Sequence, residues 1–274
     1  MTGLPMPSLE HVERGGLPLF TDEALYEACG VRIAFTGRAG GVSEGACASL
    51  NTGANTDDDP RSVAANRRTV LNAIGAHALP LIVPKQVHET RVVRIDDYPD
   101  VGRASFEAAE GADAVQVAVP DVAAMLNFAD CLPLILVAPS GRFAIVHAGW
   151  RGAVARIASK AACSLAQCWE GEDPATFNAY IGPHIGLECF EVGEDVADTF
   201  EAEFGEEVVT EDRHVDLSLV VRCDLERAGL LPERIVDCDV CTVCHSDEYF
   251  SFRATDGDCG RQAAVAYRAD ASAE

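Results

Sequence analysis

Three side chains of this sequence have the chemistry to share one divalent metal ion. His88 ends a short loop-like segment, Cys131 stands at the start of one apolar run, and His147 closes the next. Two neutral imidazoles and one thiolate fill three positions of a tetrahedral zinc ion and leave the fourth open for water or substrate, as in catalytic zinc sites. The three residues lie far apart along the chain and form no local motif, so spacing alone does not establish a metal site.

Other interpretations of these residues stay open. A cysteine or histidine beside a strand is often simply packed in the core. Cys131 and His147 can also work as a nucleophile and base without a metal. Asp130, next to Cys131, is expected to orient one of the imidazoles.

Four arginines occupy glycine-rich or loop-like surroundings: Arg38, Arg151, Arg253 and Arg261. Guanidinium groups bind phosphate through two hydrogen bonds at once, so a convergent set predicts an oxyanion site. Taken singly, each arginine can instead pair with carboxylates at the surface.

A second cysteine-rich run lies near the C-terminus and consists of Cys238, Cys241, Cys244 and His245. The run resembles a structural zinc site, or part of an iron–sulfur cluster with Cys223 or Cys259 as the fourth ligand. Its apolar neighbours fit ordinary buried thiols equally well. We expect the eleven cysteines to be core thiols and a few ligands rather than disulfides.

The elements that position the three central residues are predicted from apolar runs. Residues 132–138 and 142–147 are continuous apolar stretches, typical of strands that are covered on both faces in an α/β protein. Gly149 and Gly152 allow a tight turn, and apolar residues at helical spacing from Val154 to Trp169 predict one helix that ends near Gly171.

The rest of the chain predicts further strands and helices in one domain, residues 1–274. Strands are expected at 31–36, 81–83, 91–95, 112–119, 122–128, 178–181, 235–236, 249–252 and 262–267. Helices are expected at about 23–29, 60–74, from 194, and 217–228, with Asp59 and Asp216 as N-caps. The first 20 residues and residues 96–110 are expected to be loops.

Composition limits the possible partners. The 274 residues, 48% of them hydrophobic, can bury a full core, and no apolar run approaches the ~20 residues that cross a bilayer. The N-terminus lacks the features of a signal peptide, so a cytoplasmic location is expected. A net charge of −23 repels phosphate backbones and disfavours nucleic-acid and anionic-membrane partners. That acidity fits adaptation to high salt or a merely acidic protein.

Several motifs together resemble the laccase-domain family, whose bacterial members are called polyphenol oxidase, multi-substrate purine nucleoside phosphorylase or peptidoglycan editing factor. The motifs are FTGRAGGVSEG at 35–45, SLN at 49–51, QVHE at 86–89, ADCLPLIL at 129–136, HAGWRG at 147–152 and YIGPHIGLECFEVG at 180–193, with CTVC, FSFR and GRQ near the end. The order of QVH, ADC and HAGWRG is highly specific.

This resemblance implies a single α/β domain with mixed central β-sheets flanked by helices, a layered fold like that of cysteine hydrolases. It implies a zinc site at His88, Cys131 and His147, with copper as the alternative metal. It also implies phosphorolysis of adenosine, inosine, guanosine and methylthioadenosine, with adenosine deamination as a second activity, so that nucleoside and phosphate are the partners. The residues implied to line the substrate and phosphate pocket are Arg38, Asn51, Gln86, Arg151, Arg253 and Arg261. Gly37 and Ala254 depart from the family pattern.

Three alternatives follow from the family's other names and from the pocket. Multicopper oxidases need many imidazoles, usually in His-x-His pairs, whereas this chain has seven histidines and no such pair. Removal of a wrong amino acid from a cell-wall precursor is an amide hydrolysis that metal-activated water or the Cys131 thiolate can perform. A pocket that only binds a nucleoside as a signal is the third.

Overall fold

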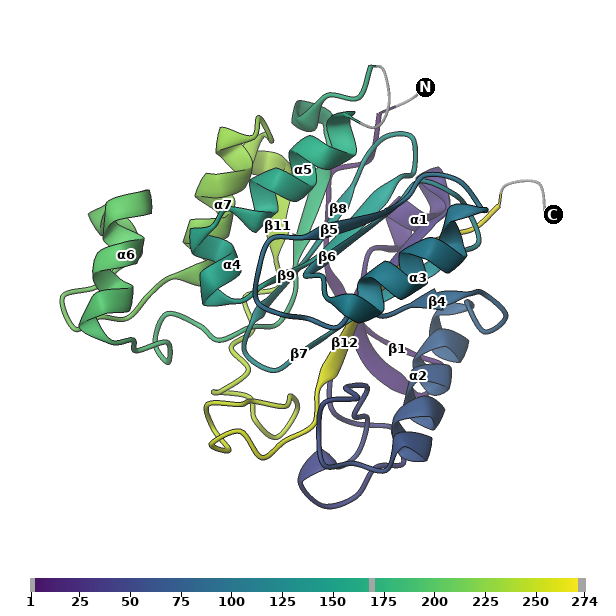
Figure 1. Cartoon of the computed structure of the whole chain (residues 1–274), viewed down its shortest axis with the longest axis horizontal. Coiled ribbons are helices and arrows are strands. Elements are labelled where there is room, and N and C mark those ends of the chain that lie inside the picture. Colours follow the sequence, from purple (N-terminus) through teal and green to yellow (C-terminus); the bar gives the residue numbers. More distant parts are fainter. Residues whose placement is uncertain (1–2, 168–170, 271–274) are drawn as a thin grey trace.

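Two β-sheets lie face to face, and helices cover their outer surfaces (Figure 1). The computed structural model describes residues 3–167 and 171–270. The strands are β1 (Glu10–Arg14), β2 (Leu17–Thr21), β3 (Val31–Thr36), β4 (Leu81–Ile82), β5 (Val92–Ile95), β6 (Ala114–Val117), β7 (Ala123–Phe128), β8 (Leu132–Val137), β9 (Phe143–Ala148), β10 (Asn178–Ile181), β11 (Ile235–Asp237) and β12 (Gln262–Arg268). The α-helices are α1 (Glu23–Cys29), α2 (Pro60–Ile74), α3 (Asp100–Glu110), α4 (Trp150–Val154), α5 (Ile157–Gln167), α6 (Glu194–Phe204) and α7 (Leu217–Arg227). Short 3-10 helices occupy Gly45–Cys47, Pro174–Thr176, Glu206–Val208 and Pro232–Arg234.

Each sheet has six strands and mixes parallel with antiparallel pairs. One sheet has the order β1-β2-β3-β12-β7-β4 and the other β11-β10-β8-β9-β6-β5. Side chains from β3, β7 and β12 meet those of β6, β8, β9 and β10 in a buried core between the sheets. The expected α/β domain with mixed β-sheets flanked by helices is confirmed, and the structure shows that there are two such sheets.

Helices close the two outer faces of this sandwich. The second sheet packs against α4, α5, α6 and α7, and the first packs against α2. In Figure 1, α4–α7 therefore lie on one side of the sheets and α2 on the other. Because both faces of β8 and β9 are covered, every residue of these strands is buried, which explains their continuous apolar sequences.

Local signals in the sequence set most of the predicted boundaries. The side chains of Asp22, Asp59 and Asp216 accept backbone N–H groups at the starts of α1, α2 and α7. Gly30 and Gly75 end α1 and α2 in the left-handed conformation, which glycine adopts without strain.

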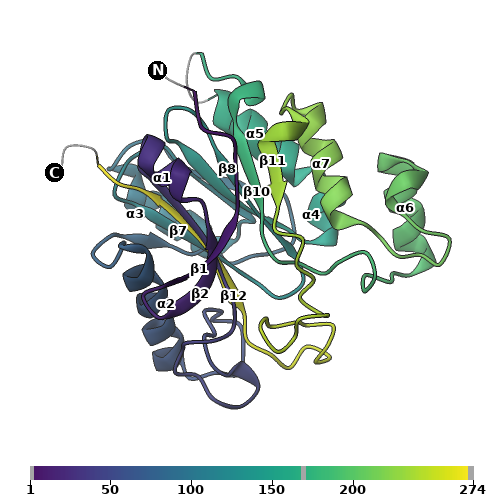
Figure 2. The ribbon, with the colours of Figure 1, turned by 180° about the vertical axis from the view of Figure 1, so that it is seen from behind.

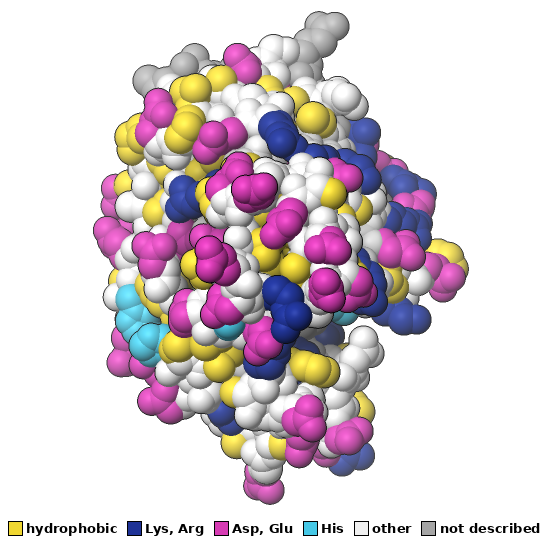
Figure 3. Space-filling view, turned by 90° about the vertical axis from the view of Figure 1, so that its left-hand side faces the viewer, with side chains coloured by type: hydrophobic (Ala, Val, Ile, Leu, Met, Phe, Trp, Pro, Cys, Tyr) yellow, Lys and Arg dark blue, Asp and Glu magenta, His cyan; other side chains and the backbone are white. Residues whose placement is uncertain are grey.

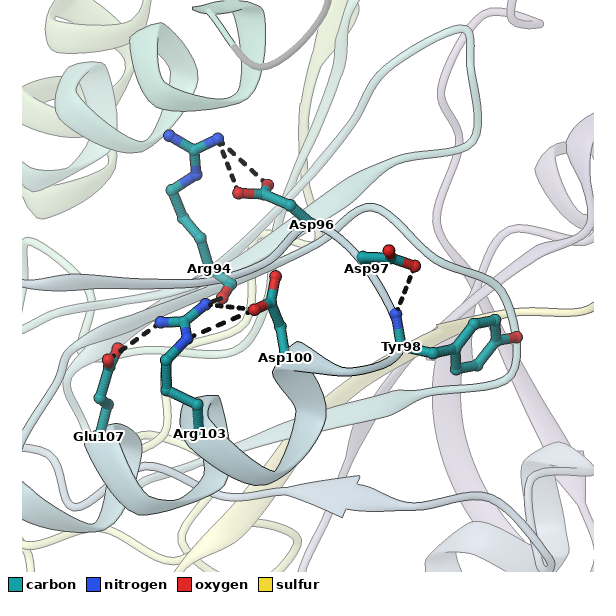
Figure 4. A network of polar contacts seen from close by, with 7 residues as sticks. All are labelled: Arg94, Asp96, Asp97, Tyr98, Asp100, Arg103 and Glu107. Carbon is teal, nitrogen blue, oxygen red and sulfur yellow. Dashed lines mark hydrogen bonds and ion pairs between the residues drawn. The ribbon is translucent and has the colours of Figure 1, made fainter.

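Residues 96–110, predicted as a loop, instead contain helix α3. Its buried side consists of the small residues Ala104 and Ala108, which gave no strong apolar pattern. On the exposed side, Arg103 pairs with Asp100 at 3.1 Å and with Glu107 at 2.9 Å, one helical turn away on either side (Figure 4). Such pairs each add only a few tenths of a kcal/mol to a helix, so burial of the alanine face is the main cause.

Other predictions were also wrong. Residues 10–21 form the hairpin β1–β2, seen from behind in Figure 2, in which Gly15 and Gly16 make the turn with positive φ. The segment 249–252 is not a strand, because the Gln262 side chain satisfies the backbone of Phe250. The predicted helix up to Gly171 breaks at Arg156, which has a φ of 62°, and Trp169 lies outside the described residues.

The surface reflects the acidic composition. Asp and Glu side chains are spread over the face shown in Figure 3, in keeping with the net charge of −23. Within residues 3–167 and 171–270, no helix has the length and apolar character required to span a bilayer.

Candidate active site

The fold brings His88, Cys131 and His147 together from three separate segments. Cys131 immediately precedes β8, and His147 lies near the end of β9, where it pairs with Pro133 of β8 in an antiparallel register. His88 comes from the loop between β4 and β5, in a left-handed conformation with a φ of 61°. One ligand atom from each of the three residues lies within 4.8 Å of the other two.

The geometry of these three side chains fits a single metal ion. The distance from Cys131 Sγ to His88 Nε2 is 3.9 Å, close to the roughly 3.6 Å between sulfur and nitrogen ligands of a tetrahedral zinc. The two imidazole rings meet edge to face with centroids 4.9 Å apart. A Cβ atom at Gly149 would come within 2.7 Å of His88 Cδ2 and 3.4 Å of Cys131 Sγ. Glycine at position 149 therefore keeps open the space beside the three ligands.

Asp113 organises two of these ligands. Its buried carboxylate accepts the backbone N–H groups of Val87, His88 and Glu89 at 2.8 to 3.2 Å, and it contacts His147 Nδ1 at 2.9 Å. Burial alone would raise the pKa of Asp113, but His147 and the N–H groups of Glu89 and His88 outweigh it and lower the pKa. Because an ionised carboxylate only accepts hydrogen bonds, His147 carries its proton on Nδ1 and leaves Nε2 free for a metal or for Cys131.

The Asp130 prediction was wrong. Its two carboxylate oxygens accept from Thr242 Oγ1 at 2.6 Å and from the backbone N–H of Arg253 at 2.6 Å. Asp113 holds the imidazole instead. Sequence reasoning missed Asp113, and the available signal was an acidic residue at the start of an otherwise apolar strand segment.

Cys131 and His147 form a charged pair when no metal is bound. Burial favours the neutral thiol, but the charge and hydrogen bond of His147, with help from His88, lower the pKa of Cys131 to about 6. Burial also disfavours the imidazolium, but the Cys131 thiolate and Asp113 raise the pKa of His147 to about 9. A thiolate therefore exists at neutral pH, ready to ligate a cation or to act as a nucleophile.

The three side chains line one cavity of about 670 Å³, within the usual range of about 300–1,000 Å³ for small-molecule sites. The basic residues that line it are Arg67, Lys85, Arg151, Arg253 and Arg261. Aromatic lining comes from Phe128, Trp150, Phe190 and Phe252. The cavity thus combines metal-capable groups, cations and flat apolar surfaces.

The predicted arginines separate into two groups. Arg151, Arg253 and Arg261 line the cavity. Arg38 does not belong to this lining: its guanidinium donates to the carbonyls of Ala48 and Ser246 and lies 4.7 Å from the Phe250 ring centroid. Arg38 therefore fastens the loop that follows β3 to the loop that precedes β12.

The two predicted amide residues also differ. Gln86 lines the cavity, and its side chain pairs with both the N–H and the carbonyl of Asn127. Asn51 is fully buried outside the lining, where its Oδ1 accepts from Gly53 N–H at 3.0 Å and from Arg261 N–H at 2.9 Å. Asn51 thus positions the backbone of two cavity residues.

Arg67 was missed as a cavity residue. It lies on α2 beside the buried Asn66, and its Nε donates to the carbonyl of Thr52 at 2.8 Å. Burial lowers the pKa of Arg67 because desolvation penalises its charge, and an anion in the cavity would offset this penalty. A basic residue within the apolar stripe of a helix was the signal in the sequence.

Comparison with known proteins identifies the family. The family model described as multi-copper polyphenol oxidoreductase laccase matches residues 32–269. The chain belongs to the laccase-domain family. A purine nucleoside phosphorylase of Deinococcus radiodurans is 37% identical over 255 residues, which cover 91% of this chain and 92% of that protein. The adenosine deaminase RL5, from an unknown prokaryotic organism, is 34% identical over 221 residues, which cover 77% of this chain and 84% of that protein.

Solved structures of the laccase-domain family share this layered fold. The Bacillus licheniformis hypothetical protein YfiH superposes with a TM-score of 0.83 and 28% identity, over 94% of this chain and 97% of that one. YlmD from Geobacillus stearothermophilus also superposes with a TM-score of 0.83 and 28% sequence identity, over 98% of this chain and 100% of that one. The two cover nearly the entire chain.

The family's oxidase description finds little support in the ligand geometry. Within residues 3–167 and 171–270, two groups of potential metal ligands occur: His88, Cys131 and His147, and Glu188, Cys189, Cys241 and Cys244. Neither contains more than two histidines, whereas multicopper oxidation requires several clustered imidazoles.

Proposed function

We propose that this laccase-domain protein is a purine nucleoside phosphorylase whose metal-dependent site also deaminates adenosine. Adenosine, inosine, guanosine and methylthioadenosine are the proposed substrates, and zinc at His88, Cys131 and His147 is the proposed cofactor. The observation that carries the proposal is that these three residues share one cavity with Arg151, Arg253 and Arg261. The names of the Deinococcus and RL5 relatives support both activities.

In phosphorolysis, a phosphate oxygen bonds to the anomeric carbon of ribose while the bond to the purine nitrogen breaks and the purine takes up a proton. Phosphate must be held and oriented for this attack, and guanidinium groups of the cavity supply both charge and paired donors. The aromatic rings of Trp150 and Phe252 offer flat surfaces for the purine. Arg67 joins the proposed phosphate-binding residues.

The metal-binding residues have a second task. When bound, zinc supplies a Lewis acid that polarises a reacting group and lowers the pKa of a water molecule, as deamination requires. Asp113 keeps the Nδ1 proton on His147 and holds the backbone around His88, so both imidazoles face the same point. The chain thereby provides a preorganised site, in which little rearrangement is needed at the moment of reaction.

A Cys–His amide hydrolase is the second candidate, and one observation favours it. Cys131, His147 and Asp113 have the order of nucleophile, base and orienting carboxylate, with the pKa of Cys131 lowered to about 6. Hydrolysis of an amide in a cell-wall precursor would use this arrangement without a metal.

One experiment separates the two candidates. Protein purified without added metal is assayed with inosine and adenosine, with and without phosphate, for free purine base and ammonia, and its metal content is measured in parallel. We expect phosphate-dependent release of base, lost together with one equivalent of metal in Cys131→Ala and His147→Ala. Amide cleavage that is independent of phosphate and survives a chelator, without release of base, would instead establish the hydrolase.

A further inference from the structure

The second group of potential ligands joins two loops, one of which, residues 182–193, also lines the cavity through Ile185 and Phe190. Its members, here called the loop cluster, are Glu188, Cys189, Cys241 and Cys244, and their ligand atoms all lie within 4.8 Å of one another. Cys189 Sγ and Cys244 Sγ are 3.6 Å apart, and Cys244 Sγ is 3.4 Å from Glu188 Oε1. Cys241 is buried, whereas Glu188 and Cys244 are exposed.

These distances match one tetrahedral ion better than other thiol chemistry. Sulfur ligands around a tetrahedral zinc lie about 3.7 Å apart. A disulfide would require about 2.05 Å between the sulfur atoms. Iron–sulfur clusters are usually held by four cysteines, whereas the loop cluster has three, and neither Cys223 nor Cys259 belongs to it. Three thiolates and one carboxylate are a donor set for zinc.

The backbone holds this arrangement in place. His184 and Cys241 form a parallel bridge, with hydrogen bonds from His184 N–H to Val240 and from Thr242 N–H to His184. Gly186 N–H donates to Cys241 Sγ at 3.2 Å, a contact that favours a thiolate because the donor faces developing negative charge. The ligands thus come from two loops that are already paired.

The four acidic groups crowd one another in the absence of a cation. Cys244 Sγ donates to Glu188 Oε1 and also lies beside Cys189 Sγ, so these groups cannot all be ionised at such short range unless a cation is present. A divalent ion would remove this conflict, because its charge stabilises all the anionic ligands at once.

We propose that the loop cluster is a second, structural zinc site of this protein, closed by four protein ligands. It joins the loop 182–193 to the loop 238–248. The Arg253 guanidinium donates to the carbonyls of Cys189 at 3.1 Å and Glu191 at 3.0 Å. The ion therefore also fixes the backbone carbonyls that position the Arg253 side chain in the cavity. It takes no part in the reaction there.

The test uses protein in which the first site is disabled by Cys131→Ala, kept reduced, and loaded with Zn²⁺ or Co²⁺. We expect about one ion per chain and, with Co²⁺, the near-ultraviolet charge-transfer absorption of three thiolates. Adding Cys244→Ser should reduce this absorption by a third and weaken retention of the ion. Cys163→Ser, which replaces an exposed thiol on α5, is the matched control and should change neither.

Absence of bound metal in the Cys131→Ala protein would overturn the proposal, as would a cobalt spectrum without thiolate absorption. The cobalt spectrum of the Cys131→Ala protein tests the proposed site even if the protein that also carries Cys244→Ser fails to fold. The same spectrum can be recorded with His147→Ala in place of Cys131→Ala. These readouts do not depend on activity, so absence of phosphorolysis in the native protein, with an intact loop cluster, would count against the proposed function alone.

Discussion

The carboxylate of Asp113 contacts His147 Nδ1 at 2.9 Å and at the same time accepts the backbone N–H of His88 at 3.0 Å. One buried side chain thereby holds the imidazole of His147 and the backbone of His88, 59 positions apart in the sequence. His88 needs this support because its φ of 61° is uncommon for a residue with a Cβ atom.

Asp113→Asn should weaken metal binding and turnover by about 10–100-fold, the range found for residues that orient metal ligands. The amide presents donors as well as an acceptor, so it cannot accept three backbone N–H groups and keep the Nδ1 proton on His147. Zinc affinity by competition with a chelator, together with the rate of base release, measures the effect. Asp130→Asn is the control, and we expect it to leave zinc affinity unchanged. Equal losses in both variants would contradict the role assigned to Asp113.

Arg67→Lys should raise the KM for phosphate roughly tenfold, with little change in kcat, because a charge-assisted hydrogen bond of about 1.5–3 kcal/mol is lost or weakened. Initial rates at varied phosphate and saturating inosine give both constants. Arg68→Ala, an exposed neighbour on the same helix, serves as the control. A KM equal to that of the native protein would exclude Arg67 from the phosphate site.

Much of the fold could be predicted because its signals are local. Continuous apolar runs marked β8 and β9, and aspartates before helices marked α1, α2 and α7. Helix α3 was missed because its buried side is made of alanines, and the β1–β2 hairpin because β1 is largely polar and exposed. Both α3 and the hairpin are stabilised by the residues that they bury against the rest of the protein, and a local pattern of small or polar residues does not reveal that burial.

The candidate site was predictable to a similar extent. His88, Cys131 and His147 have residue types that suggest a shared ion, and the chain brings them together. A charged residue within an apolar segment was the signal for Asp113 and for Arg67, but it does not reveal their roles, because both act through contacts with residues distant in sequence. Arg38 lies in a glycine-rich loop, which is typical of residues that bind ligands. Its guanidinium instead donates to backbone carbonyls of the protein itself.

Gly149→Ala should lower zinc affinity at the first site by at least about tenfold, since an imidazole displaced by even a fraction of an ångström no longer meets the geometry of the ion. The backbone at this position, with φ of −68° and ψ of 163°, accepts alanine, so the metal-free protein should unfold at nearly the native temperature. The added Cβ would lie 2.7 Å from His88 Cδ2. Gly102→Ala on α3, where nothing lies within 4 Å, controls for the substitution itself. Native affinity in Gly149→Ala would show that the ion does not sit beside this glycine.

In metal-free protein, alkylation of Cys131 by iodoacetamide should persist down to about pH 6, because the pKa of this thiol is lowered to about 6. The direction of this pH dependence follows from the ion pair. Because the charged His147 stabilises the thiolate, the thiolate is present above about pH 6 and is lost as it takes up a proton below that pH. Peptide-resolved mass spectrometry across pH 5 to about 9 measures the profile, with alkylation of the exposed Cys163 followed in the same digests. His147→Ala removes the largest stabilising charge and should move the profile of Cys131 to higher pH. If the two profiles coincide, the charge of His147 does not stabilise the Cys131 thiolate.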